Sequence, residues 1–198
     1  NGGAACTAAN RFYVSKKVAA QFTEKLTAAM ADIKMASGLT EGAQLGASVS
    51  VKERNKIADL VTASISQGAE LKLGGKTPDG DGAFYPPTVL TVAADNEILK
   101  EEIFGPVAVI VTVDSDEQAI ALANDTEYGL ISYIYSADLG RALKVAEAME
   151  SGMVAINRGV ISDPAAPFGG YKQSGLGREG GFDGVHEFLE KKYIGAAF

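Results

Sequence analysis

The sequence predicts an α/β domain in three layers, a mostly parallel β-sheet flanked by helices on both faces. Two observations carry this prediction. Strand-length apolar runs alternate with segments of helical periodicity, and the runs are apolar at almost every position, as in strands covered on both faces. The connections between them are short, which favours right-handed crossovers between parallel strands.

The first half of the chain begins with a predicted strand at residues 11–14. A helix follows, because apolar residues recur at helical spacing along one stripe: Val18, Phe22, Leu26, Ala29, Met30 and Ile33. A second helix is predicted from near Ser50, where Ser50 and Glu53 have the spacing of a capping box. The segment Pro78–Gly82 predicts a turn or loop.

Residues 107–157 have the clearest pattern. Strands are predicted at Val107–Val113, Leu130–Tyr135 and Met153–Asn157. Between them we expect a helix capped by Ser115 and Gln118 and ending near Asn124, and a second helix over 139–150. Strands alternating with helices in this way predict one parallel sheet.

Residues 158–184 are rich in glycine and lack periodicity, which in a compact domain is typical of a functional or mobile segment. A short helix near Val185–Glu190 and a final strand, Lys191–Phe198, are predicted to close the chain. No repeat or low-complexity linker is present, so we place no domain boundary within residues 1–198.

Composition excludes several classes of function. The chain has 198 residues, of which 46% are hydrophobic and 22% charged, a balance typical of a globular domain. Its net charge of −7 argues against a nucleic-acid partner. No apolar run approaches the roughly 18 residues of a membrane helix, so no membrane partner is expected. A single cysteine excludes an internal disulfide, and with no visible signal peptide the predicted compartment is the cytoplasm.

Cys6 is the first candidate for chemistry. It follows two glycines and lies among alanines, a pattern that we expect to place the sulfur near a helix N-terminus, where the helix dipole and free N–H groups stabilise a thiolate. The same N–H groups could hold an oxyanion on the attacked carbon. A cysteine hydrolase also needs a base, but the only histidine, His186, is predicted to be a surface or structural residue. Without a second His or Cys, no metal site is predicted.

The run Gly175–Gly180 matches the G-x-G-x-x-G pattern of dinucleotide-binding proteins. That pattern has its meaning directly after a buried strand and at the start of a helix. The preceding residues, 167–174, cannot form such a strand, so we reject this interpretation.

Three segments together resemble the aldehyde dehydrogenase superfamily. Asn1-x-Gly3-x-x-Cys6 is similar to the motif around the family's catalytic cysteine, although Ala4 stands where the family usually has Gln. Glu101-Glu102-Ile103-Phe104-Gly105-Pro106 is identical to a family motif. The third segment runs from Pro167 to Glu179. The resemblance covers nearly the whole chain, and within the superfamily it is strongest to succinate-semialdehyde dehydrogenases.

The resemblance implies NAD(P)-dependent oxidation of an aldehyde, with succinate semialdehyde as the expected substrate. Cys6 is then the nucleophile, forming a thiohemiacetal and afterwards a thioester that water hydrolyses. Glu102 matches the residue that holds the nicotinamide ribose hydroxyls, and Phe104 the residue that packs against the nicotinamide. The cofactor is expected to be NAD or NADP. Outside the family motif, Glu102 and Phe104 would read as a solvated acid and a core aromatic.

For the substrate, Ser162 matches a serine that hydrogen-bonds the distal carboxylate, and Phe168 an aromatic that lines the substrate tunnel. Asn157 matches a family asparagine near the active site and fits a strand-end turn former equally well. Glu70 with Leu73-Gly74-Gly75-Lys76 imitates the family's general-base motif, but that motif precedes the cysteine. We therefore interpret this stretch as a strand followed by a glycine turn.

By this resemblance, the general base and the N-terminal NAD(P)-binding domain precede Asn1, so we expect the chain alone to be inactive. The terminal strand resembles the arm that joins subunits, which predicts a homo-oligomer in the full-length enzyme. Two alternatives stay open: a dehydrogenase for another aldehyde, and a non-catalytic scaffold or oligomerisation domain.

Overall fold

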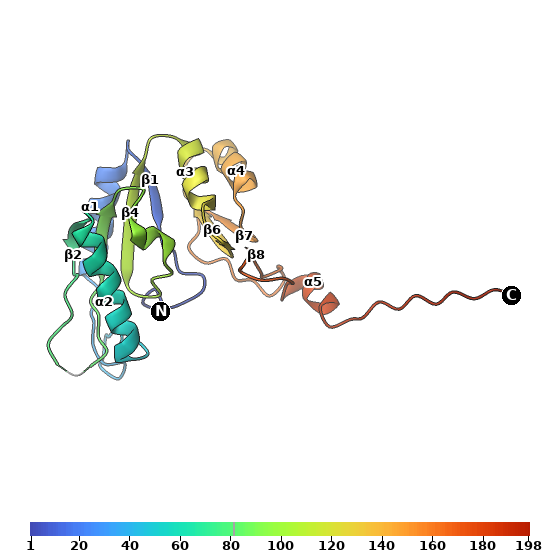
Figure 1. Cartoon of the computed structure of the whole chain (residues 1–198), viewed down its shortest axis with the longest axis horizontal. Helices are drawn as coiled ribbons and strands as arrows, with labels where there is room; N and C mark the ends of the chain where they lie inside the picture. The colour runs from blue at the N-terminus through green and yellow to red at the C-terminus, as the bar shows by residue number, and fades with distance from the viewer. Residues whose placement is uncertain (81) are drawn as a thin grey trace. The chain divides into compact units, whose positions relative to one another are not determined.

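The computed structural model describes residues 1–80 and 82–198, which form two compact units, Asn1–Ala123 and Asn124–Phe198 (Figure 1). The division falls at the end of a helix, α3 (Asp116–Asn124), rather than in a linker. This explains why neither composition nor turn residues mark it in the sequence.

The first unit contains a four-stranded sheet in the order β1-β4-β3-β2. Its central strand β4 pairs in parallel with β1 on one side and β3 on the other, whereas the edge strand β2 runs antiparallel to β3. The mostly parallel sheet predicted from the sequence is confirmed. The strands span Phe12–Ser15 (β1), Glu70–Leu73 (β2), Thr88–Val92 (β3) and Val107–Val113 (β4).

Helices cover both faces of this sheet, which confirms the three-layer architecture. Helix α1 (Ala19–Ala31) packs on one face, where Phe22, Leu26 and Met30 contact a cluster that includes Ile110. Helix α2 (Val51–Ser66), the 3₁₀ helix η1 (Glu97–Lys100) and α3 pack on the other. Alternate residues of β4 reach the two faces: Val107, Val109, Val111 and Val113 on one, Ala108 and Ile110 on the other.

Two helix starts follow the predicted capping residues. The Ser50 hydroxyl accepts the N–H of Glu53 at 3.2 Å and begins α2. The Ser115 hydroxyl accepts the N–H of Gln118 at 3.2 Å, and the Gln118 side chain accepts the N–H of Asp114 at 2.8 Å. Both caps satisfy N–H groups that the first helical turn leaves unpaired.

The second unit is built on a strand–helix–strand element. Strands β6 (Ile131–Ile134) and β7 (Met153–Ile156) pair in parallel and are joined through α4 (Leu139–Ala148). Two short strands, β5 (Tyr128–Gly129) and β8 (Tyr171–Lys172), pair antiparallel. The prediction of one sheet over residues 107–157 is therefore wrong. Both edges of β4 are occupied by β1 and β3, and among the described residues β6 and β7 pair with each other in a separate sheet.

The C-terminal predictions also need correction. The last helix, α5, spans Gly181–His186 rather than 185–190, beginning after Gly180 at a φ of 75°. Residues 191–198 are exposed and form neither helix nor strand. A strand is defined by a hydrogen-bonded neighbour, and no described segment of this chain pairs with 191–198.

In the Pro78–Gly82 segment, Asp79, Gly80 and Gly82 are bends and Pro78 has no regular structure, while Asp81 lies outside the described residues. Over residues 1–80 and 82–198, no helix has the length and apolar character needed to cross a membrane.

We predict that Tyr85→Phe stabilises the first unit, most of all at alkaline pH. The Tyr85 ring is 1% exposed, and its hydroxyl has no hydrogen-bond partner among the described residues, because the Thr88 hydroxyl donates to Pro86 O and accepts from Gly75 N. Burial raises the pKa of Tyr85 above its ordinary value of 10.0. Removing the hydroxyl should raise the free energy of unfolding by about 1 kcal/mol at neutral pH.

The pH dependence has a definite sign. As the pH rises through 10.0, Tyr85 ionises in the unfolded chain but stays protonated in the folded one, so the wild type loses stability and Tyr85→Phe does not share this loss. Urea unfolding at neutral and alkaline pH measures the difference. Tyr193→Phe, at a side chain 94% exposed, is the matched control. Parallel pH curves for wild type and Tyr85→Phe would contradict the prediction.

Candidate active site

Cys6 lies in an exposed loop formed by two tight turns. The Ala4 N–H donates to Asn1 O at 3.0 Å, and the Ala8 N–H donates to Ala5 O at 2.9 Å. The predicted helix N-terminus at Cys6 is wrong, since the first helix of the chain starts at Ala19. In the first turn, Gly2 and Gly3 adopt positive φ angles of 59° and 74°, a region that glycine enters without strain.

Glu102 and Phe104 lie on the crossover that joins the parallel strands β3 and β4. Ile103 between them is 1% exposed and packs in the core, so its neighbours on either side are directed outward. Both Glu102 and Phe104 are exposed, Phe104 by 42%. Phe104 also has a φ of 55°, a conformation that costs a non-glycine residue energy and persists only where its surroundings hold it.

The structure brings the Cys6 loop and this crossover segment together. Asn10 bridges them, with its Nδ2 donating to Glu101 O at 2.8 Å and its Oδ1 accepting the Ile103 N–H at 3.0 Å. Arg11 adds a bond from its guanidinium to Leu99 O at 2.8 Å. Gly3 lies so close to Gly105 that a Cβ on it would be 2.0 Å from the Gly105 oxygen.

The parallel pairing of β1 with β4 explains this arrangement. Phe12 of β1 is in register with Ile110 of β4, so the segments that precede the two strands emerge at the same edge of the sheet. Cys6 precedes β1 and Phe104 precedes β4. Sequence reasoning missed the contacts of Asn10 and Gly3. The partners of Asn10 are 91 and 93 residues away and Gly105 is 102 residues from Gly3, so only the strand register relates them.

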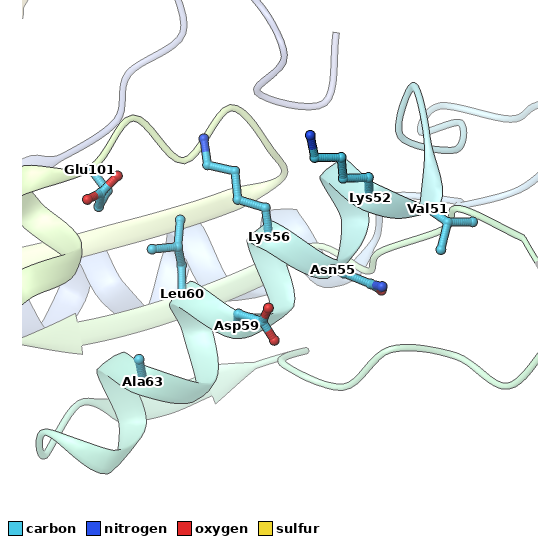
Figure 2. Close-up of a pocket in the computed structure, with 8 residues that line it drawn as sticks. All are labelled: Val51, Lys52, Asn55, Lys56, Asp59, Leu60, Ala63 and Glu101. Atoms are coloured by element: carbon cyan, nitrogen blue, oxygen red, sulfur yellow. The ribbon is translucent and has the colours of Figure 1, made fainter.

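An open pocket of about 860 Å³ borders the same crossover (Figure 2). One side of α2 lines it together with Glu101, and Figure 2 shows the Lys52 and Lys56 side chains extending from the helix in the same direction. The Lys56 ammonium donates to the backbone oxygen of Glu102 at 2.9 Å. This contact was not foreseen, although Lys52 and Lys56 have the four-residue spacing of neighbours on a helix face.

Ser162 and Phe168 lie together in the second unit. Both line a pocket of about 160 Å³ with Gly152, Met153, Ile161, Asp163, Ala166 and Pro167. Phe168 is held by a backbone bridge to Glu179, with N–H to O distances of 2.7 and 2.9 Å. The Ser162 hydroxyl has no hydrogen-bond partner among the residues that the structure describes, so it can accept or donate a bond to a ligand.

Asn157 has a clear structural role at the end of β7. Its Oδ1 accepts the Ser136 N–H at 2.9 Å, and its Nδ2 donates to Ser136 O at 2.8 Å. Its φ is 52°, a value that asparagine tolerates better than most residues. These contacts match the interpretation of Asn157 as a strand-end turn former, and they occupy both polar atoms of its side chain.

The stretch that imitates a general-base motif is a strand and a glycine turn, as predicted. Glu70 begins β2, and Gly74 and Gly75 follow it with φ angles of 70° and 78°. The hydrogen bond and charge of Lys72 hold the pKa of the Glu70 carboxyl below its ordinary value of 4.5. A general base works best with a pKa near the working pH, so this shift is in the wrong direction for that role.

Two further points concern the histidine and metal binding. His186 ends α5 and is exposed. Within residues 1–80 and 82–198, no three His, Cys, Asp or Glu side chains gather closely enough to hold a metal ion.

Comparison with known proteins gives consistent matches. The aldehyde dehydrogenase family model matches residues 1–194. A succinate-semialdehyde dehydrogenase of Paenarthrobacter nicotinovorans is 50% identical over 198 residues, and a glutarate-semialdehyde dehydrogenase of Pseudomonas putida is 45% identical over 195. These matches cover 100% and 98% of this chain but only 44% and 40% of the relatives' length.

Solved structures agree with the sequence matches. An NADP-dependent enzyme of E. coli superposes with a TM-score of 0.94 at 42% identity, covering 98% of this chain and 40% of that one. An identity of 42% indicates a relative of the same family as well as a shared fold.

We predict that Gly3→Ala detaches the Cys6 loop from the crossover. The new methyl group would overlap the Gly105 carbonyl at 2.0 Å and force a φ of 74° on an alanine. The expected loss is about 1–3 kcal/mol in the free energy of unfolding, measured with urea. Gly38→Ala is the matched control, because a Cβ at Gly38 meets nothing within 4 Å. Equal stabilities for the two variants would show that the close approach to Gly105 does not exist.

Proposed function

The chain belongs to the aldehyde dehydrogenase family, and from this premise we propose that it carries the nucleophile and part of the cofactor and substrate contacts of an NAD(P)-dependent aldehyde oxidation. The proposed substrate is succinate semialdehyde and the proposed nucleophile is Cys6. The chain spans 44% of the length of its succinate-semialdehyde relative, so we propose the complete reaction for a protein of the relatives' full length.

One observation supports the proposal. The only thiol of the chain and the exposed side chains of Glu102 and Phe104 lie on segments that enter β1 and β4 at the same end of the sheet. Asn10 and the contact between Gly3 and Gly105 hold the two segments together. This arrangement suits a nucleophile that reacts next to a bound cofactor, because the thiol is held near an exposed carboxylate and an exposed aromatic ring.

The residues present fit a dinucleotide. The Glu102 carboxylate is exposed and offers two acceptor oxygens for ribose hydroxyls. The Phe104 ring is exposed and fixed in a strained backbone conformation, as expected of a side chain that a flat ring stacks against. NAD and NADP both carry the nicotinamide ribose, so these two residues do not select between them.

In the proposed mechanism, the Cys6 thiolate attacks the aldehyde carbon and forms a thiohemiacetal. The Cys6 backbone N–H donates no hydrogen bond to any described residue, which leaves it available to the oxyanion. A dinucleotide held by Glu102 and Phe104 would supply the acceptor for the hydride of that carbon. The thioester that remains on Cys6 is then hydrolysed by water, which releases the acid and restores the thiol.

Ser162 and Phe168 are proposed to bind the far end of the substrate. The Ser162 hydroxyl can donate to a carboxylate, and the Phe168 ring supplies an apolar wall for the methylene chain. The names of the relatives include both succinate and glutarate semialdehydes, which differ by one methylene. Oxidation of such another aldehyde is therefore the first alternative.

A role in assembly is a second candidate, because apolar side chains are exposed near the C-terminus: Phe188 by 90%, Tyr193 by 94% and Phe198 by 119%. Homo-oligomer formation through residues 191–198 stays a prediction, as does the cytoplasmic location. A non-catalytic scaffold would need no reactive thiol, so the reactivity of Cys6 separates the two functions.

The test of the proposed function is alkylation of Cys6 by iodoacetamide, followed by mass spectrometry. Cys6 is the only cysteine, so all labelling reports on it, and Cys6→Ser gives the background. Succinate semialdehyde should slow the labelling, because the thiohemiacetal occupies the sulfur, and butyraldehyde, which lacks the carboxylate, should slow it less. Equal labelling rates with and without either aldehyde would contradict the proposed nucleophile.

Ser162→Ala should weaken protection by succinate semialdehyde about ten- to hundredfold, which corresponds to one lost hydrogen bond to a charged group. Protection by butyraldehyde should not change, since it has no carboxylate to bind. Ser37→Ala, at an exposed serine of the other unit, is the control. An equal loss for both aldehydes would mean that Ser162 supports the pocket without recognising the carboxylate.

A further inference from the structure

We propose that Asn10 is a positioning residue, which fixes the Cys6 loop relative to Glu102 and Phe104 so that the thiol and the cofactor contacts move as one body. Asn10 contributes two hydrogen bonds to the coupling of the two segments, beside the close contact of Gly3 with Gly105. What the two segments do rests on the proposed function.

The contact geometry is specific to an asparagine. One amide side chain reaches an acceptor and a donor of the opposite backbone, Glu101 O at 2.8 Å and Ile103 N at 3.0 Å. It therefore bonds the chain on both sides of the Glu102 residue. An aspartate keeps the acceptor but has no donor at neutral pH, and an alanine has neither.

The position of these bonds links them to the strained residue. Ile103 directly precedes Phe104, whose φ is 55°. A residue keeps such a conformation only where neighbouring contacts determine it. The Ile103 N–H held by Asn10 is one such contact, and Gly105, against which Gly3 packs, is on the other side of Phe104. The Cys6 loop thus holds Phe104 from both sides.

The consequence for the reaction is geometric. Misplacement of a reacting group by about 1 Å can cost on the order of a hundredfold in rate. A thiol on a loop of turns has little rigidity of its own, since no helix or strand includes residues 1–11. The two hydrogen bonds of Asn10 restrict the motion of this loop. They tie it to the segment with Glu102 and Phe104, the proposed cofactor contacts.

Hydrogen exchange of the chain, followed by NMR or mass spectrometry, tests the coupling. In Asn10→Ala, the amide of Ile103 and the turn amides of Ala4 and Ala8 should all exchange about tenfold faster. Asn10→Asp keeps the side-chain size and the acceptor, so Ile103 should stay protected while the turn amides still exchange faster. Acceleration in only one of the two segments of Asn10→Ala would overturn the proposal.

Asn124 provides a matched control. Its side chain makes the same kind of double contact, from Nδ2 to Ala148 O at 2.9 Å and from Glu150 N to Oδ1 at 2.9 Å, within the other unit. Asn124→Ala should leave exchange at Ile103, Ala4 and Ala8 unchanged. If it accelerates them as much as Asn10→Ala does, the effect is a general loss of stability and the proposal fails.

A second measurement separates positioning from structure. In a protein that carries the family's NAD(P)-binding domain ahead of these residues, NAD⁺ or NADP⁺ should change the rate of Cys6 alkylation in the wild type, and Asn10→Ala should lose most of this response, by about tenfold. An undiminished response in Asn10→Ala would overturn the positioning role. If the wild type responds to neither dinucleotide, the proposed cofactor role of Glu102 and Phe104 fails, while the exchange experiment still decides whether Asn10 couples the two segments.

Discussion

The parallel pairing of β4 with a strand on each side is the constraint on which the rest of the first unit depends. All of β4 except Thr112 is buried, and its alternate side chains reach the cores on both faces of the sheet. With β1 and β3 at its two edges, β4 has no edge left for a further strand. This fixes the three layers of the first unit.

The same pairing creates the site. Ligands of open α/β sheets usually bind at the carboxyl ends of the strands, whereas here Cys6 and Phe104 precede β1 and β4 and lie at the amino ends. The loops there are held by glycine turns, by the Asn10 amide and by the close contact of Gly3 with Gly105. The site is therefore only as well ordered as these few contacts make it.

Local patterns in the sequence were sufficient for most elements of the fold. The bounds of β4 and the capped start of α2 follow from apolar runs and from Ser50. The pairing of the strands could not be predicted from local patterns, because no local signal indicates that β4 pairs with β1. The prediction of one sheet over residues 107–157 was therefore wrong. For the site, motif resemblance pointed to Glu102 and Phe104, but Asn10 was missed, since its partners are 91 and 93 residues away. The helix expected at Cys6 failed because Gly2 and Gly3 favour turns.

The most direct test of the central claim, that Cys6 and Phe104 belong to one site, uses the absence of tryptophan from the chain. A bimane attached to Cys6 is quenched by a tryptophan only at short range. Phe104→Trp should quench it strongly. Ile65→Trp should not, because Ile65 lies about 12 Å along α2 from Ile57, the residue that touches Gly105. Equal fluorescence in the two variants would mean that the thiol loop does not lie against the cofactor segment, and the proposed site would be wrong.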